Sequence, residues 1–237
     1  RVMTRTQAFG FYAQNFVALA ERLTDQNAED GPVRERLWQV RAGEVVIATG
    51  AIERPLVFPG NDRPGVMLAE AARIYLNRYG VAVGSRIAIV TAHDSAYRVA
   101  LDLKDAGIEV VAIADVRAVT ASELVNAARE VGIRIIDNAT VAGTKGRLRV
   151  ASVGIATMFG GSIGAPEWIA CDSLLMCGGW TPSLHLHSQS RGKVVWDDAR
   201  QVFVPGKSVQ AERSAGACRG VFGLSAVLRD GSGAAAV

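Results

Sequence analysis

The sequence has few cysteines, few histidines and little net charge, and each shortage excludes a class of site. It contains three cysteines, Cys171, Cys177 and Cys218, an odd number without C-x-x-C spacing, and three histidines. This set fits neither a zinc site nor a disulfide framework, so we predict no metal ligands and a reducing, cytoplasmic compartment. Lysine and arginine number 26 against 23 acidic residues, and the net charge of +3 gives no strong field for nucleic acid or a membrane.

Long apolar runs are also missing from the sequence. No run approaches the roughly 18 to 20 residues needed to span a bilayer, and residues 1–5 do not start a secretory signal. Aromatic residues make up only 6% of the 237 residues, whereas hydrophobic residues make up 49% and glycines number 25. This composition favours one large or two small α/β domains with many tight turns.

The order of the predicted elements in the middle of the chain indicates a parallel sheet. Apolar strands at 86–91, 108–115 and 133–136 alternate with helices at 95–106 and 122–131, and a glycine closes each helix. Strands and helices in this order imply right-handed crossovers within one parallel sheet.

The flanking segments add antiparallel structure. We predict an antiparallel β-meander over 5–42 with a polar turn at 25–32. Further elements are expected as follows: a helix at 68–79, an antiparallel ribbon over 141–157, one buried strand over 168–179, an extended segment carrying His185 and His187, a short helix at 224–228, and a frayed tail at 231–237. The predicted fold class is therefore α/β, a FAD/NAD(P)-binding Rossmann-like fold with a parallel sheet, βαβ units and an antiparallel meander.

The turn at 91–96 departs from the glycine-rich turn that binds a dinucleotide. A G-x-G-x-x-G/A turn lets pyrophosphate approach the backbone at a helix N-terminus, but this turn reads Thr-Ala-His-Asp-Ser-Ala. His93 places a ring, and Asp94 a negative charge, where the phosphate would lie. We predict a degenerate site, although Asp94 could cap the following helix and either residue could serve another ligand. Asp115, without the glycines, is predicted to be a turn residue.

Small residues also end two other strands. Ala48-Thr49-Gly50 allows close approach of a dinucleotide, and Glu53 and Arg54 beyond it are either functional or an exposed pair at a chain crossing. Cys177 precedes two glycines that resemble a domain junction, and we expect it to be a small buried residue. For His185 and His187, a structural role is favoured over a catalytic one.

The chain resembles the α subunits of heterotetrameric sarcosine oxidase over nearly its whole length. The segments that carry the resemblance are Gly10-Phe11-Tyr12, 37–42, 45–55, 61–69, 75–79, 94–97, 178–182 and 185–189. On this basis we predict two domains. Residues 1–60 with 183–237 form a partial first dinucleotide-binding domain that lacks its amino-terminal βαβ unit, and residues 61–182 form a second, degenerate NAD-like domain.

The resemblance implies an oxidoreductase complex that acts on CH–NH donors with oxygen as acceptor. Such a complex demethylates sarcosine to glycine, forms peroxide and passes the one-carbon unit to tetrahydrofolate. It implies partner subunits β, γ and δ, FAD in the β subunit, FMN at the α–β interface, and noncovalent NAD in the α subunit. It assigns no catalytic residue to this segment, so we expect the 237-residue chain to be inactive alone.

The resemblance also implies a set of residues at the end of the NAD site. They are Thr49, Gly50, Gly216, Ala217, Phe222 and Leu224. Ala217 stands where flavoproteins usually carry an acid, which argues against ordinary FAD binding. Phe222 and Leu224 replace the leucine and threonine expected in the family, and packing at a helix start is their alternative role.

Two other functions stay open at this point. The chain could belong to a related opine oxidase, dye-linked amino-acid dehydrogenase or hydrogen cyanide synthase, and the presence of a folate-binding domain in the gene would discriminate. It could also be a non-catalytic assembly module, since glycines are missing at Thr91 and His93.

Overall fold

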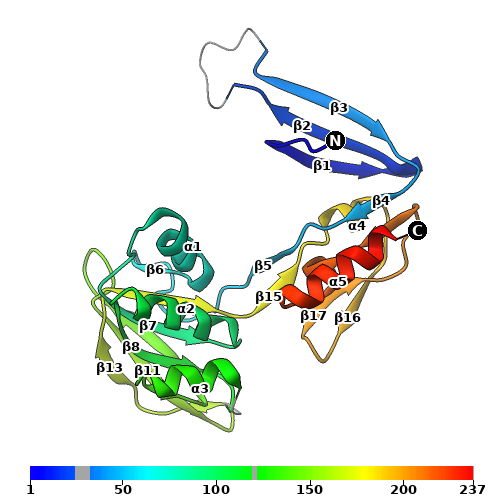
Figure 1. Cartoon of the computed structure of the whole chain (residues 1–237). Helices are drawn as coiled ribbons and strands as arrows, with labels where there is room; N and C mark the ends of the chain where they lie inside the picture. Colours follow the sequence, from blue (N-terminus) through cyan, green and yellow to red (C-terminus); the bar gives the residue numbers. More distant parts are fainter. Residues whose placement is uncertain (25–32, 119–121, 237) are drawn as a thin grey trace. The chain divides into compact units, whose positions relative to one another are not determined.

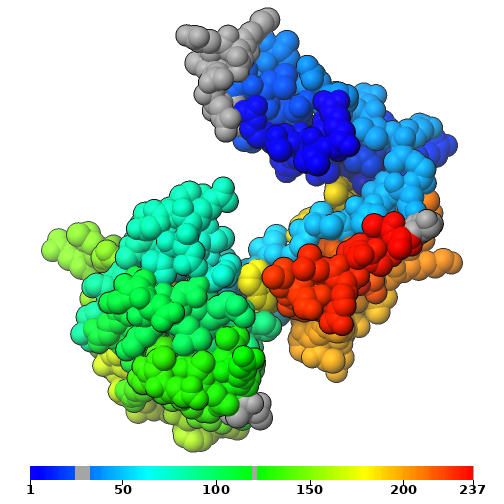
Figure 2. Space-filling model, viewed as in Figure 1, coloured from blue at the N-terminus to red at the C-terminus, as the bar shows by residue number. Residues whose placement is uncertain are grey.

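The computed structural model describes residues 1–24, 33–118 and 122–236, and the remaining residues are grey in Figures 1 and 2. The chain divides into two compact units, here called unit 1 (residues 1–52 and 180–237) and unit 2 (residues 53–179). The predicted polar turn at 25–32 lies outside the described residues.

Unit 2 contains the predicted parallel sheet, whose strand order is β6-β14-β7-β8-β9. Figure 1 labels β6, β7 and β8 of this sheet. The strands are β6 (Val66–Leu68), β7 (Arg86–Thr91), β8 (Glu109–Asp115), β9 (Ile135–Ile136) and β14 (Ser173–Cys177). All four neighbouring pairs are parallel. The connecting helices are α1 (Ala69–Tyr79), α2 (Ser95–Asp105) and α3 (Glu123–Glu130).

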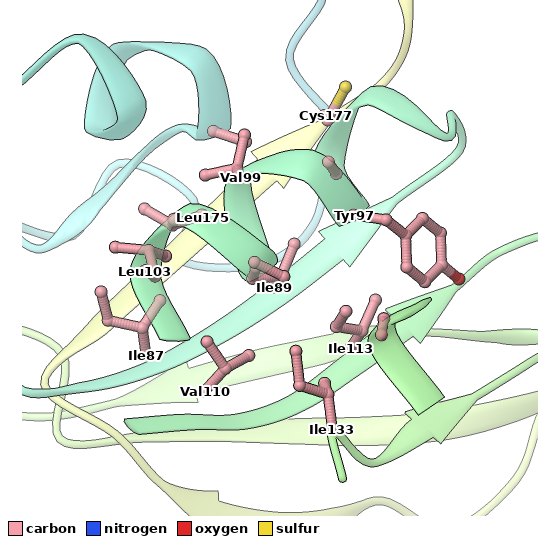
Figure 3. Packing of buried hydrophobic residues seen from close by; sticks show 14 of the residues in the cluster. Ile87, Ile89, Tyr97, Val99, Leu103, Val110, Ile113, Ile133, Leu175 and Cys177 are labelled. Carbon is pink, nitrogen blue, oxygen red and sulfur yellow. The ribbon is translucent and has the colours of Figure 1, made fainter. Parts of the chain in front are cut away.

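Helix α2 shows why these segments fold as they do. Its buried residues, Ala96, Tyr97, Val99, Ala100 and Leu103, recur at the three- and four-residue spacing of one helix face. Figure 3 shows Val99 and Leu103 of α2 near Ile87, Ile89 and Leu175 of the sheet, all within one buried cluster. Burying each such side chain stabilises the fold by about 2 kcal/mol.

The other face of the sheet packs on an antiparallel sheet. Its strands are β10 (Ala139–Lys145), β11 (Ser152–Phe159), β12 (Ser162–Ile163) and β13 (Glu167–Ala170). Val141, Val153 and Ile155 from this sheet join Ala88, Val90 and Leu174 of the parallel sheet in a second buried cluster.

The single strand predicted over 168–179 is wrong, because the chain turns at Asp172. Both Asp172 carboxylate oxygens accept hydrogen bonds from main-chain N–H groups, of Ser85 at 2.9 and 3.1 Å and of Arg86 at 3.1 Å. Partial burial alone would raise the pKa of Asp172, but a bond from the Ser85 hydroxyl at 2.6 Å and these main-chain bonds hold it below its usual value. The carboxylate thus ends β13 and starts β14 beside β7.

Unit 1 is built mainly from strands. The predicted meander is present as β1 (Thr6–Tyr12), β2 (Phe16–Arg22) and β3 (Glu35–Arg41), with a short 3₁₀ turn at Ala13–Asn15. Three two-stranded sheets follow: β4 (Val45–Ile47) with β18 (Glu212–Ser214), β5 (Ala51–Glu53) with β15 (Trp180–Pro182), and β16 (Val194–Asp197) with β17 (Val202–Pro205). A 3₁₀ turn spans Gly216–Arg219. The buried hydrophobic cluster of this unit contains Phe11, Ile47 and Cys218.

Two predictions for unit 1 are wrong. The segment with His185 and His187 is not extended but forms helix α4 (His185–Gln189). The terminal helix α5 does not end at 228 before a frayed tail at 231, but runs over Leu224–Ala235 and is coloured red in Figures 1 and 2. Gly231 and Gly233 each cost a helix about 1 kcal/mol, which favours an early end. Within the longer helix, Asp230 accepts hydrogen bonds from the Gly216 N–H and the Arg219 guanidinium.

None of the helices in the described part of the chain is long and apolar enough to cross a membrane.

Candidate functional site

The turn after β7 uses its hydrogen-bonding groups internally. The Thr91 hydroxyl accepts from the His93 main-chain N–H at 2.9 Å and donates to the His93 carbonyl at 2.7 Å. The Ser95 N–H donates to His93 Nδ1 at 3.1 Å. Burial, followed by the nearby Arg117 cation, lowers the pKa of His93, which favours a neutral ring able to accept that bond. These two amides therefore point at the turn's own side chains and not toward a ligand.

Asp115 does more than the turn residue that we predicted. Its side chain is fully buried at the end of β8, and Oδ2 accepts from the Tyr97 hydroxyl at 2.9 Å. Arg117 donates to Oδ1 from its main-chain N–H at 2.9 Å and from Nε at 3.0 Å, and to Oδ2 from a guanidinium N–H at 2.8 Å. Burial raises the pKa of Tyr97, and the bonds to Asp115 raise that of Arg117.

Asp94 also binds Arg117 rather than capping helix α2. Its Oδ1 accepts from the Arg117 guanidinium at 2.7 Å, and no side-chain cap is present at the start of α2. Partial burial would raise the pKa of Asp94, but the bonds from Arg117 and Ser122 hold it below its usual value. The acid at the end of β8 and the acid of the turn are thus both bound to one arginine, and the degenerate site stays a prediction.

Sequence reasoning missed Arg117 because its signal is long-range. Its two carboxylate partners and Tyr97 are brought together only when β7, α2 and β8 are assembled.

Glu53 and Cys177 form a second buried polar group in unit 2. The alternative that Glu53 is exposed is wrong: it is 7% exposed, and its Oε2 accepts from the Glu70 N–H at 2.8 Å. Because no side chain at the start of α1 caps the helix, Glu53 supplies that acceptor from β5. Burial raises the pKa of Glu53, and it raises the pKa of Cys177 to about 11. All three cysteines are buried, and the prediction that Cys177 is a small buried residue is confirmed.

The residues predicted for the NAD site lie in unit 1, and the pairing of β4 with β18 brings four of them to one sheet edge. The two strands are parallel, with Ile47 beside Ser214. Thr49-Gly50 and Gly216-Ala217 therefore both follow the carboxyl ends of neighbouring strands, where ligands of α/β sheets bind. Phe222 lies two residues before helix α5 and Leu224 is its first residue, where Leu224 is 78% exposed. The helix contacts the second of these turns, because Asp230 accepts from the Gly216 N–H.

The surroundings of these residues fit a dinucleotide in part. Gly50 has a φ of +74°, and a Cβ there would meet no atom within 4 Å, so the space beside it is open. No side chain caps α5, so its first turn can receive a phosphate. The Gly216 N–H, however, already donates to Asp230 Oδ2 at 2.7 Å, and the Thr49 hydroxyl donates to the Ser183 carbonyl at 2.7 Å.

Within residues 1–24, 33–118 and 122–236, no group of three or more histidine, cysteine or acidic side chains could hold a metal ion.

Comparison with known proteins gives relatives in one enzyme class. No family model matches the chain. It is 42% identical to the α subunit of sarcosine oxidase from Corynebacterium sp. strain P-1, over 99% of this chain and 25% of that protein. Identity to the corresponding α subunit from Rhizobium meliloti is 41%, over 98% of this chain and 23% of that protein. An opine oxidase subunit from Agrobacterium tumefaciens is 38% identical over 32% of this chain and 15% of that protein.

Solved structures share the fold. L-proline dehydrogenase from P. horikoshii has a TM-score of 0.62 at 22% identity, covering 90% of this chain and 36% of that one. Thioredoxin reductase from T. acidophilum has a TM-score of 0.64 at 16% identity, covering 96% of this chain and 69% of that one. An NAD-dependent persulfide reductase from A. fulgidus has a TM-score of 0.61 at 18% identity, covering 92% of this chain and 39% of that one.

The predicted fold class and the predicted resemblance are therefore confirmed. The chain has the α/β fold of FAD/NAD(P)-dependent oxidoreductases, and over nearly its whole length it is similar to the α subunit of sarcosine oxidase, of which it spans about a quarter.

Proposed function

We propose that this chain is part of the α subunit of a sarcosine oxidase complex. The complex would demethylate sarcosine to glycine, reduce oxygen to peroxide and transfer the one-carbon unit to tetrahydrofolate. The observation that carries the proposal is the sequence identity of about 40% to sarcosine oxidase α subunits over nearly the whole chain. Its β, γ and δ partner subunits, its FAD and FMN, and its cytoplasmic location are parts of the same proposal.

For this chain, the proposed role is to hold and orient NAD in unit 1. Gly50 would leave room for the dinucleotide, and the uncapped first turn of α5 would face a phosphate. NAD supplies a dinucleotide whose nicotinamide can accept or give a hydride. Gly216, Ala217, Thr49, Phe222 and Leu224 complete the proposed contacts.

We also propose that unit 1 is a partial dinucleotide-binding domain. Strands β4 and β18 form a parallel sheet of only two strands, although parallel sheets are normally covered on both faces. Helix α5 contains no buried residue, and Leu224 and Leu228 are exposed on it. A further βαβ unit of the whole protein, placed beside β4, would cover this surface and provide the pyrophosphate-binding turn.

The experiment that tests the function uses the full-length protein expressed with the neighbouring genes. We expect a complex containing flavin and NAD, with peroxide formation that depends on sarcosine and formaldehyde release that falls when tetrahydrofolate is added. A full-length protein that assembles with no flavin-bearing partner, or that forms no peroxide with sarcosine, would contradict the proposal.

A second candidate is membership of an opine oxidase complex, supported by the shorter match to the opine oxidase relative. Dye-linked amino-acid dehydrogenase and hydrogen cyanide synthase belong to the same alternative. Oxidation of an opine in preference to sarcosine by the purified complex, without an effect of tetrahydrofolate, would favour this candidate. An assembled complex whose copy of this chain lacks any nucleotide would favour an assembly module.

A further inference from the structure

Helix α4 carries a histidine whose ring lies inside unit 1. His187 is 1% exposed. Its Nδ1 lies 3.0 Å from Glu212 Oε2, and its Nε2 lies 2.9 Å from the main-chain carbonyl oxygen of Lys193. A carboxylate and a carbonyl are both acceptors, whereas a neutral imidazole carries only one N–H. A neutral ring beside an ionised Glu212 would leave one nitrogen lone pair facing an acceptor oxygen.

The bonds around Glu212 indicate where the additional proton lies. The Ser208 hydroxyl donates to Glu212 Oε2 at 2.6 Å, and the Ser214 hydroxyl donates to Oε1 at 2.7 Å. Two hydroxyl donors and the ring N–H together favour an ionised carboxylate. The carboxylate side chain is completely buried, so it also needs a compensating cation. Both requirements are met when His187 carries a proton on each nitrogen.

Gly192 keeps the ring in this orientation. A Cβ at Gly192 would lie 2.4 to 2.7 Å from ring atoms Cε1, Nε2 and Nδ1 of His187. The ring therefore packs directly against the glycine backbone. The carboxylate of Glu212 faces the His187 ring. His185 lies on the same helix, but its side chain is exposed.

The pair joins α4 to the strand that precedes the proposed cofactor turn. Glu212 begins β18, which lies parallel to β4 with Glu212 beside Val45. Four residues later the chain reaches Gly216, after the Ala215 N–H donates to the Ile47 carbonyl at 2.8 Å. Helix α4 is itself bonded to β1, because Gln189 Oε1 accepts from the Phe11 N–H at 2.8 Å.

We propose that His187 is a positioning residue held as a doubly protonated imidazolium. Its ion pair with Glu212 anchors β18 to α4 and thereby fixes the turn at Gly216 and Ala217. The charge state and the anchoring stand on the geometry of unit 1. The statement that the anchored turn serves NAD rests on the proposed function.

The charge state is tested by nitrogen NMR of this chain labelled at its histidines. We expect both ring nitrogens of His187 to be protonated at neutral pH, where an unconstrained histidine is mostly singly protonated. His187→Gln identifies the signals, and the exposed His185 is the internal control. A bare nitrogen on the His187 ring at neutral pH would overturn the proposal.

The anchoring is tested by hydrogen exchange of the Ala215 and Gly216 amides. We expect His187→Gln to accelerate both roughly tenfold or more, with no change in the β7 and β8 amides of unit 2, and His185→Gln to change neither. Adding Glu212→Gln to His187→Gln removes the unpaired buried charge and should slow the exchange again. Unchanged exchange in His187→Gln, or a double variant that exchanges as fast as the single one, would refute the anchoring.

Neither the nitrogen NMR measurement nor the hydrogen-exchange measurement depends on nucleotide binding. A full-length protein without NAD would therefore refute the proposed function, whereas these experiments would still decide the charge state and the anchoring of His187.

Discussion

At the residue scale, buried carboxylates organise unit 2. Asp115 is completely buried and accepts hydrogen bonds from Tyr97 and Arg117, and Arg117 in turn binds Asp94. A buried charge is costly unless it is paired and hydrogen-bonded, so the value of Arg117 lies mainly in compensating Asp115. Glu53 is a second case, in which a buried acid accepts from the first turn of α1.

Removing Arg117 should destabilise unit 2 through Asp115. We expect Arg117→Ala to lower the free energy of unfolding by about 3 kcal/mol, because Asp115 keeps only the Tyr97 hydroxyl and one main-chain N–H. Urea unfolding measures the change. Arg98→Ala, at an exposed position of α2, is the control and should change stability by less than about 0.5 kcal/mol. Equal effects of the two variants would contradict the prediction.

The free energy of unfolding at acidic pH should depend on Asp94. Because Arg117 and Ser122 hold its pKa below the usual value, the ionised form favours the fold, and this contribution is present above about pH 4. It is lost as the pH falls through the lower pKa of the folded protein. Urea titrations should therefore show a gap between wild type and Asp94→Asn that closes toward pH 2. If the difference in stability between wild type and Asp94→Asn instead grew as the pH fell, the prediction would be wrong.

Glu53 should show the reverse dependence on pH. Burial raises its pKa, so the folded protein favours the protonated form, and stability falls as the pH rises through the usual glutamate value of about 4.3 and up to the raised value. Glu53→Gln keeps the acceptor for the Glu70 N–H without the charge, and should be at least as stable as wild type at pH 7. Glu53→Ala should cost about 1 kcal/mol or more. Thermal unfolding at pH 4 and pH 7 distinguishes these outcomes.

At the scale of elements, close backbone contacts set where the strands run. Gly178 follows β14, and its N–H donates to the Arg54 carbonyl at 2.6 Å, while the Arg54 N–H donates to the Gly179 carbonyl at 2.8 Å. A Cβ at Gly178 would lie 2.9 Å from the carbonyl oxygens of both Arg54 and Pro55. These are main-chain atoms, which cannot move aside as a flexible side chain can.

Gly178→Ala should therefore separate these two segments. We expect a loss of about 2 kcal/mol or more in the free energy of unfolding. Gly143→Ala is a matched control in the same unit, because its Cβ would lie 3.8 Å or more from its neighbours, an ordinary contact. Denaturant unfolding followed by circular dichroism measures both. Comparable stability of the two variants would show that the close approach is not required.

At the scale of the whole molecule, the two units differ in their cores. Unit 2 contains two extensive clusters, on the helical and the antiparallel sides of its sheet, whereas the cluster of unit 1 contains Phe11, Ile47 and Cys218. Buried apolar surface is the main source of folding free energy, so stability should be concentrated in unit 2.

Residues 53–179 should fold without the rest of the chain. We expect limited proteolysis to cut unit 1 first, and the expressed segment to unfold in one cooperative transition. Retained near-ultraviolet circular dichroism and dispersed amide NMR signals would be the readout. A segment that stays unfolded would show that unit 2 depends on unit 1.

The 237-residue chain should have negligible affinity for NAD by calorimetry. In the turn after β7, the Ser95 N–H donates to His93, and Arg117 pairs with both Asp94 and Asp115. In unit 1, the Gly216 N–H already donates to Asp230. Binding in the micromolar range would refute this prediction and would point to an open site in this chain.

The sequence by itself determined the elements whose signals are local. The helices near 68–79, 95–106 and 122–131 follow from periodicity and closing glycines, because each buries apolar residues on one face. The strand at 86–91 and the meander follow from runs of β-forming residues between turn signals. The loss of the phosphate-binding glycines and the resemblance to sarcosine oxidase α subunits are likewise readable from residues in order.

Only the tertiary structure decided how distant polar side chains meet. Asp115 becomes a buried ion-pair centre, Glu53 a helix cap and His187 an anchor of β18, since each finds its partner on another element. The strand over 168–179 is broken at Asp172 for the same reason, because its carboxylate binds amides at the start of β7. Such bonds join residues that are distant in the sequence and close in space, and a periodic pattern along the sequence does not predict which of them meet.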